Sequence, residues 1–147
     1  MILSNFVESL SELLLQANLS PSEFAKQIGC GKGTISRYLH EQKIPELGLL
    51  IRMADFFDCS TDYLLGRETE KYTCTFTKPC PSFQERLPKL CAELKITKYQ
   101  LQKQTGIAES AIYNWQNGTS KPRLDNLLKI ADAFNCSLDF IIGRSSL

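Results

Sequence analysis

The chain has 147 residues, of which 43% are hydrophobic and 22% are charged, close to the averages of soluble globular proteins. Seventeen Lys and Arg residues against sixteen Asp and Glu residues give a formal charge of +1 at pH 7. The length fits one ordinary domain or two small ones, and the composition excludes disordered and collagen-like proteins. Apolar runs are far shorter than a membrane-spanning helix needs, and the N-terminus lacks the features of a signal peptide. We therefore expect a cytoplasmic protein with no membrane partner.

An internal repeat organises the chain. An ungapped shift of 77 residues places residues 6–67 over residues 83–144, and 19 of these 62 pairs are identical. Many other pairs keep their apolar character, so the shared pattern is that of a hydrophobic core. We expect a duplicated domain, with the first copy over 1–67, the second over 82–147 and a short extended linker over 68–81.

The predicted linker shows a pattern of its own. Its threonines alternate with Tyr72, Cys74 and Phe76, and such alternation of β-forming residues indicates an extended segment. Two interpretations stay open. The segment either forms a short strand that pairs elsewhere, or it is an extended connection whose Phe76 and Tyr72 pack on a neighbouring helix.

The first copy predicts five helices. Apolar residues at three- and four-residue spacing indicate an amphipathic helix over 4–17. Ser20, Pro21 and Glu23 supply an N-cap, a first-turn proline and a capping box, so a second helix begins at 21 and ends at Gly29. The remaining helices of this copy are expected over 32–39, 47–57 and 60–66.

The second copy repeats this order, with Thr97 and Ser137 as N-caps and Gly106, Gly118 and Gly143 as C-terminal stops. Its helices are expected over 82–94, 98–105, 109–117, 123–134 and 137–142. The chain is therefore predicted to be all-α, with two tandem five-helix units.

In each copy, the second and third helices are joined by a short turn that contains Gly29 or Gly106. Two helices joined by a turn of three or four residues form a helix-turn-helix, whose second helix lies in the major groove of DNA. The helix-turn-helix segments are expected at 21–40 and 98–117. Each copy is thus predicted to present one DNA-reading helix.

The outward positions of the two predicted reading helices carry polar side chains that suit phosphates and base edges. In the first copy they are Lys32, Gly33, Thr34, Ser36 and Arg37. In the second copy they are Glu109, Ser110, Tyr113, Asn114 and Gln116.

Longer motifs surround these helices. The first copy carries Leu19-Ser20-x-x-Glu23-Phe24-Ala25-x-x-Ile28-Gly29, then Thr34-Ile35-Ser36-Arg37, and finally Cys59-Ser60-x-Asp62-Tyr63-Leu64-Leu65-Gly66. The second carries Ile96-Thr97, Gly106-Ile107, Ile112, Trp115, Asn117-Gly118 and Cys136-Ser137-Leu138-Asp139-Phe140-Ile141. With these motifs the chain resembles the Cro and lambda-repressor-like (XRE-type) helix-turn-helix regulators over nearly its whole length outside the predicted linker. The resemblance implies two lambda-repressor-like domains, a double-stranded DNA partner, and a sequence-specific regulator that represses transcription by occupying its operator.

The resemblance and the residue types together define a set of candidate DNA-binding residues. They are Ser22, Lys32, Gly33, Thr34, Ser36, Arg37, Lys43, Lys98, Tyr99, Glu109, Ser110, Tyr113, Asn114 and Lys121. Family members often carry Gln at the first residue of the second helix, where this chain has Pro21 and Lys98. Pro21 cannot make the contact of that Gln, whereas Lys98 could replace it electrostatically.

Charge is unequally divided between the copies: residues 1–67 carry −2, residues 68–81 carry 0 and residues 82–147 carry +3. The reading helix of the second copy nevertheless carries no cation. We therefore hypothesise that the first copy reads bases while the second mainly binds phosphates. The cations for that role are Lys98, Lys103, Lys121 and Arg123.

The remaining aromatic residues, the cysteines and the histidine are expected to have structural roles. Trp115 and Tyr38 occupy equivalent positions and are expected in the core. Buried thiols are expected at three positions, namely Cys30, Cys59 and Cys136. The remaining cysteines lack the spacing of a zinc site, and no catalytic set can be built around His40, the single histidine. We expect no metal, no cofactor and no enzymatic activity.

A second functional hypothesis stays open. The near-neutral charge and Glu109 favour a protein-interaction module, such as an antitoxin or co-regulator, that keeps the helix-turn-helix scaffold with weak or lost DNA binding. Thr34, Ser36 and Arg37 favour the DNA-binding regulator. The two copies are expected to act either as an intramolecular pseudo-dimer or within a homodimer.

Overall fold

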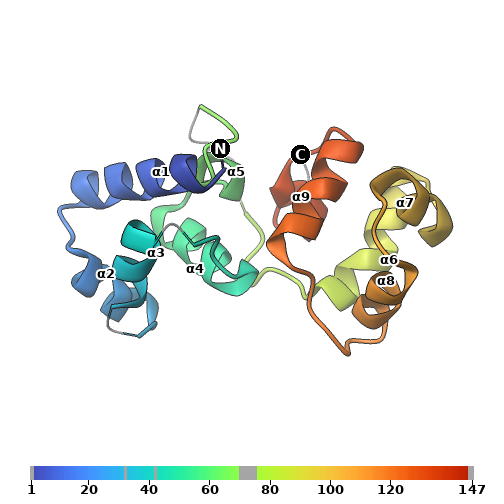
Figure 1. Ribbon diagram of the computed structural model, residues 1–147, viewed down its shortest axis with the longest axis horizontal. Helices are drawn as coiled ribbons and strands as arrows, with labels where there is room; N and C mark the ends of the chain where they lie inside the picture. The colour runs from blue at the N-terminus through green and yellow to red at the C-terminus, as the bar shows by residue number, and fades with distance from the viewer. Residues whose placement is uncertain (1, 32, 42, 70–75, 146–147) are drawn as a thin grey trace. The chain divides into compact units, whose positions relative to one another are not determined.

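A computed structural model describes residues 2–31, 33–41, 43–69 and 76–145 (Figure 1). Within these residues the chain has ten helices and no strand, and it divides into two compact units, Met1–Thr73 and Cys74–Leu147. The helices of the first unit are α1 (Ile2–Ala17), α2 (Pro21–Ile28), α3 (Thr34–Glu41), α4 (Leu47–Phe57) and α5 (Thr61–Leu64). Those of the second are α6 (Phe83–Leu94), α7 (Lys98–Thr105), α8 (Glu109–Gln116), α9 (Leu124–Ala133) and α10 (Leu138–Ile142). The predicted all-α fold with five helices in each unit is confirmed.

Capping residues determine where α2 and α7 begin. The Glu23 N–H donates to Ser20 Oγ at 3.1 Å, and the Ser20 N–H donates to Glu23 Oε1 at 3.1 Å. Thr97 and Gln100 form the same reciprocal pair at α7, with distances of 3.1 and 2.8 Å. The hydrogen bond from the Ser20 backbone, then that from its hydroxyl, lowers the pKa of Glu23. Both predicted helix starts are confirmed, because each box satisfies N–H groups that a helix leaves unpaired.

Two predicted features differ from the structure. The reading helix of the first unit begins at Thr34 rather than at 32, because Gly33 has a φ of +94° that no right-handed helix contains. Lys32 lies outside the described residues. No strand occurs in the described part of 68–81, and residues 70–75, which include Tyr72 and Cys74, lie outside it.

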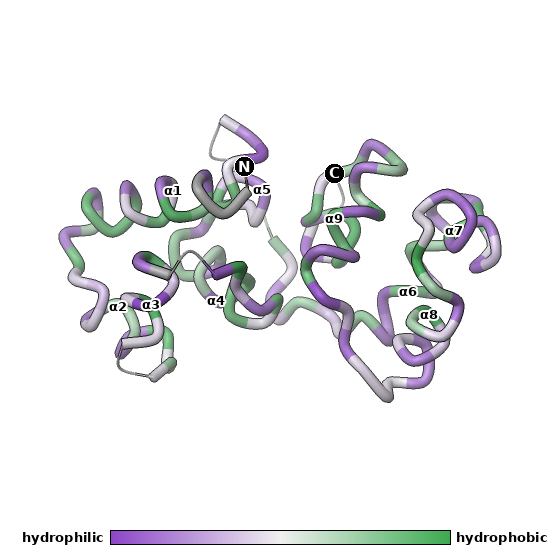
Figure 2. Tube along the Cα trace, in the orientation of Figure 1, coloured by the Kyte–Doolittle hydropathy of each residue, from purple (hydrophilic) through white to green (hydrophobic). Residues whose placement is uncertain are grey.

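The core of the first unit forms where one face of each helix meets the others. Polar and apolar residues alternate along α1 with the helical repeat (Figure 2), and Phe6 and Leu10 of its apolar face are 0% exposed. α1 packs on α3 and α5, while α2 packs on α3 and α4. Each such side chain contributes about 1.5–3 kcal/mol by leaving water. The resulting core holds α3 by its inner face.

The core of the second unit is built in the same way. Trp115 of α8 is 3% exposed and meets Phe83 of α6 edge to face, with ring centroids 5.7 Å apart. Its counterpart Tyr38 is half-buried and meets Phe6 at 6.5 Å in the same geometry. The prediction of a core position is confirmed for Trp115, whereas Tyr38 is only half-buried.

The cysteines only partly follow expectation. Cys59 is fully buried, but Cys30 and Cys136 are half-buried, so the expected burial is wrong for these two. Cys59 and Cys136, which are equivalent in the repeat, therefore differ in burial. Burial also raises the pKa of the Cys91 and Cys136 thiols, and the described cysteines form no disulfide.

A buried ion pair closes the second unit. Arg144 is 0% exposed and its Nη1 lies 2.8 Å from Oδ1 of Asp139, itself 2% exposed. The Phe76 ring lies 4.0 Å from the Arg144 guanidinium carbon, and the Thr77 N–H donates to the Arg144 carbonyl at 2.8 Å. Of the two interpretations of the extended segment, the structure supports packing for Phe76. The Phe76 side chain packs over the Arg144–Asp139 ion pair beside the end of α10, and not on the face of a helix.

The first unit has an equivalent but less buried pair. Arg67 Nε lies 3.0 Å from Asp62 Oδ1, with 22% of the Arg67 side chain exposed. None of the described helices is long and apolar enough to cross a membrane.

Replacing Arg144 with Ala is expected to lower the free energy of unfolding by about 3–5 kcal/mol, because the Asp139 carboxylate would stay buried without its cation. Arg67→Ala is the matched control, and it should cost clearly less because water reaches its ion pair. Urea denaturation followed by circular dichroism compares the two variants. Equal losses of stability would contradict this interpretation of the Arg144 pair.

Candidate nucleic-acid interface

Each unit joins two helices through a glycine-containing turn. The turn lies between Ile28 and Thr34 in the first unit and between Thr105 and Glu109 in the second, and Gly29 and Gly106 have φ values of +77° and +73°. The first turn is longer than expected because α3 begins late. The Cys30 N–H donates to the Ala25 carbonyl at 3.0 Å, which holds the turn against α2. α2 packs on α3 and α7 packs on α8, so both units contain a helix-turn-helix.

One buried isoleucine orients each reading helix. Ile35 of α3 is 0% exposed and Ile112 of α8 is 4% exposed. Positions spaced i, i+3, i+4 and i+7 on the opposite side form one stripe along each helix. We call these positions the outer stripes. The outer stripe of the first unit comprises Ser36, Arg37 and His40 of α3 together with Gly33, which precedes the helix. That of the second comprises Ser110, Tyr113 and Asn114 of α8 together with Asn117, its C-cap residue.

The outer stripe of the first unit presents one cation. Arg37 is exposed, and within the described part of the chain its guanidinium makes no ion pair or hydrogen bond. His40 Nδ1 lies 2.7 Å from the Ser36 carbonyl, to which it donates, and 3.4 Å from Ser36 Oγ. The N–H groups of the Arg37 guanidinium are thus available to a ligand, while His40 is held in place by its hydrogen bond to Ser36.

The outer stripe of the second unit has different chemistry. Tyr113 is 63% exposed, and Asn114 beside it is half-buried. The side-chain amide of Asn114 makes no hydrogen bond to any residue that the structure describes. Asn117 differs, since its Oδ1 accepts the Thr119 N–H at 2.9 Å and caps the turn after α8. An amide and an aromatic ring are therefore the groups that α8 offers to a ligand.

Further candidate residues flank the reading helices. In the second unit Lys98 and Tyr99 are exposed at the start of α7, Glu109 at the start of α8 and Lys121 before α9. Lys103 Nζ lies 5.6 Å from the centre of the Tyr99 ring. In the first unit, Ser22 is exposed in the first turn of α2, Thr34 is half-buried at the start of α3, and Lys43 is exposed after it.

Sequence reasoning missed two positions of the outer stripes, His40 and Asn117. Each lies seven residues after the first position of its stripe, so the helical period could have identified both. His40 was considered solely as a candidate catalytic residue. Asn117 was considered solely as part of a motif.

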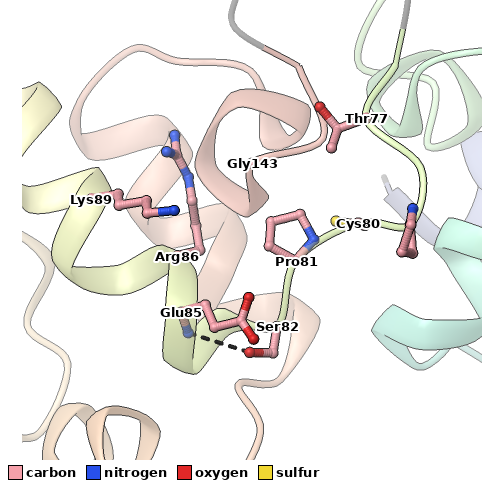
Figure 3. A pocket seen from close by; sticks show the side chains of 9 residues that line it. Thr77, Cys80, Pro81, Ser82, Glu85, Arg86, Lys89 and Gly143 are labelled. Atoms are coloured by element: carbon pink, nitrogen blue, oxygen red, sulfur yellow. Dashed lines mark hydrogen bonds between the residues drawn. The ribbon is translucent and has the colours of Figure 1, made fainter.

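A pocket of about 480 Å³ lies elsewhere in the second unit, where Arg86 and Lys89 of α6 face Cys80 and Pro81 (Figure 3). The Arg86 guanidinium donates to the Phe140 carbonyl at 2.6 Å and to the Ile141 carbonyl at 3.3 Å. It also contacts Glu93 at 2.6 Å. Its charge therefore ties α6 to α10. The described residues contain no cluster of three side chains that could hold a metal ion.

Both units match known domain families. Residues 10–64 match the helix-turn-helix family, and residues 86–144 match the family described as Cro/C1-type HTH DNA-binding domain. No solved structure shows a significant match to the chain.

Three curated relatives each match a stretch of 59 to 67 residues of the chain. The chain is 37% identical over 67 residues to the HTH-type transcriptional regulator AnsR of Bacillus subtilis, which is 46% of this chain and 58% of that protein. It is 29% identical over 59 residues to the HTH-type transcriptional regulator ImmR of the same organism, or 40% of this chain and 46% of that one. It is 33% identical over 61 residues to the cryptic phage CTXphi transcriptional repressor RstR of Vibrio cholerae, or 42% and 54%.

The chain thus spans about half the length of the curated relatives that it matches. Its two matched families correspond to its two compact units, and each unit contains a helix-turn-helix. The chain therefore carries two Cro/C1-type helix-turn-helix domains in tandem.

Proposed function

We propose that this chain binds double-stranded DNA in a sequence-specific manner and represses transcription by occupying its operator. The observation that carries the proposal is the outer stripe of α3, where the exposed Arg37 guanidinium makes no bond to the described part of the chain. The matched DNA-binding family supports DNA as the partner, and the relative named a repressor supports repression. The proposed activity is binding, without a catalytic step.

The reading step belongs to α3. In a helix-turn-helix the second helix enters the major groove, where guanine presents O6 and N7 as two acceptors. The planar guanidinium of Arg37 can donate to both at once. Ile35 lies on the buried face, so the helix cannot rotate this arginine away without exposing its anchor. The start of α2 would approach the phosphate backbone through the exposed Ser22, whose hydroxyl can donate to a phosphate oxygen.

Phosphate binding in the second unit rests mainly on Lys98 and Lys121. Both are exposed, and neither makes an ion pair within the described residues. The other two cations of the hypothesis are already engaged. Arg123 Nε lies 3.6 Å from Asp125 Oδ1, and Lys103 lies over the Tyr99 ring.

Two reading helices in one chain can supply the pair that a helix-turn-helix dimer presents to two half-sites. Light scattering of the chain at micromolar concentration separates the alternatives. A monomeric mass would support an intramolecular pair, and a dimeric mass would support a homodimer.

Arg37→Ala should weaken binding to the preferred operator by about 1–3 kcal/mol, the typical value of a two-point contact to guanine. Arg37→Lys keeps the charge but lacks the planar guanidinium with its paired N–H donors. It should therefore lose most of the preference for the operator, while its binding to random duplex DNA stays unchanged. Fluorescence anisotropy on both DNAs measures the difference. Wild-type operator preference in Arg37→Lys would refute the guanine contact.

Lys98→Ala should reduce the slope of log affinity against log salt by about 1, because one phosphate contact and its released counterion are lost. Lys129→Ala removes the same charge from α9, outside the helix-turn-helix, and serves as the matched control. Titrations at several salt concentrations give both slopes. Equal slopes for the two variants would show that Lys98 makes no specific phosphate contact.

A further inference from the structure

We infer that the two units read different bases, so that the preferred operator consists of two unlike half-sites rather than a palindrome. This inference rests on the proposed DNA-binding function. It revises the hypothesis that the first unit reads bases while the second mainly binds phosphates, because it gives α8 a base-reading role as well.

The first step compares the outer stripes position by position. The 77-residue repeat pairs Gly33 with Ser110, Ser36 with Tyr113, Arg37 with Asn114 and His40 with Asn117. All four pairs differ, whereas the buried anchors Ile35 and Ile112 are identical. The two reading helices are therefore held in their units in the same way but expose different chemistry.

The second step assigns a base to the first unit. Arg37 carries donors and no acceptor, and beside it His40 Nδ1 donates to the Ser36 main-chain carbonyl. A group with several donors in one plane pairs best with the two acceptors of guanine. The half-site read by α3 should therefore contain a G·C pair opposite Arg37.

The third step assigns bases to the second unit. The Asn114 amide has both a donor and an acceptor, and it makes no hydrogen bond within the described chain. This combination matches N6 and N7 of adenine. Next to it, the 63% exposed Tyr113 ring offers an apolar surface that suits the methyl group of thymine. The half-site read by α8 should therefore contain neighbouring A·T pairs.

The fourth step concerns phosphate binding by α8 itself. This helix carries no cation, and Glu109 is exposed in its first turn, where it repels phosphates. The residues of α8 itself therefore add no attraction to the DNA backbone, which in this unit is left to Lys98 and Lys121 outside the helix. The contribution of α8 to binding must come from contacts of Tyr113 and Asn114 with base edges.

Selection of preferred sites from a random duplex pool tests the inference, using the full chain and five variants. Arg37→Ala should lose the G·C preference alone, and Asn114→Ala the adenine preference alone, each by about 5- to 140-fold. Tyr113→Phe should keep the thymine preference because the ring remains, whereas Tyr113→Ala should lose it. Gln104→Ala, which removes an exposed amide from α7, is the matched control and should select the wild-type site. Thermal melts verify that each variant folds.

Two unlike half-sites with these separate losses would support the inference. A selected site made of two copies of one motif, a single half-site, or an unchanged preference in Asn114→Ala would overturn it while leaving the proposed DNA binding intact. If no sequence is enriched from the pool, both the inference and the proposed function fail.

Discussion

The burial of one isoleucine in each reading helix determines which residues can meet DNA. Ile35 and Ile112 are 0% and 4% exposed, and each contributes about 1.5–3 kcal/mol by leaving water. Because an α-helix has a period of 3.6 residues, an anchor on one face determines the residues of the opposite face. The outer stripes therefore follow from packing within each unit. Their chemistry can differ between the units without any change in the fold.

The fold was predictable wherever its determinants are local in the sequence. Ser20 with Glu23, and Thr97 with Gln100, form the capping boxes that their spacing predicts. Gly29 and Gly106 end α2 and α7 in the left-handed conformation that favours glycine. The internal repeat strengthened each assignment, because the same signal occurs twice. The buried faces also followed from helical periodicity.

Features that depend on distant contacts could not be predicted in this way. Arg67 and Arg144 are equivalent in the repeat, yet Arg144 alone lies beneath Phe76, a residue from outside the repeat. Cys59 and Cys136 are also equivalent but differ in burial. Gly33 was assigned to a helix because its neighbours form one, although glycine also permits the positive φ that it adopts. For the candidate site, the stripes were largely predictable, whereas the bond between Ser36 and His40 required coordinates.

The chain has a net charge of +1, so its affinity for DNA must come from individual cations rather than from an overall field. Fluorescence anisotropy of the full chain on random-sequence duplex DNA, between about 50 and 200 mM salt, tests this most directly. Binding that is measurable at the lower concentration and weakens steeply as salt rises is the predicted result. If no binding is measured at the lower salt concentration, or if binding does not change as salt rises, the result would contradict DNA binding. It would favour a protein-interaction module on the same scaffold.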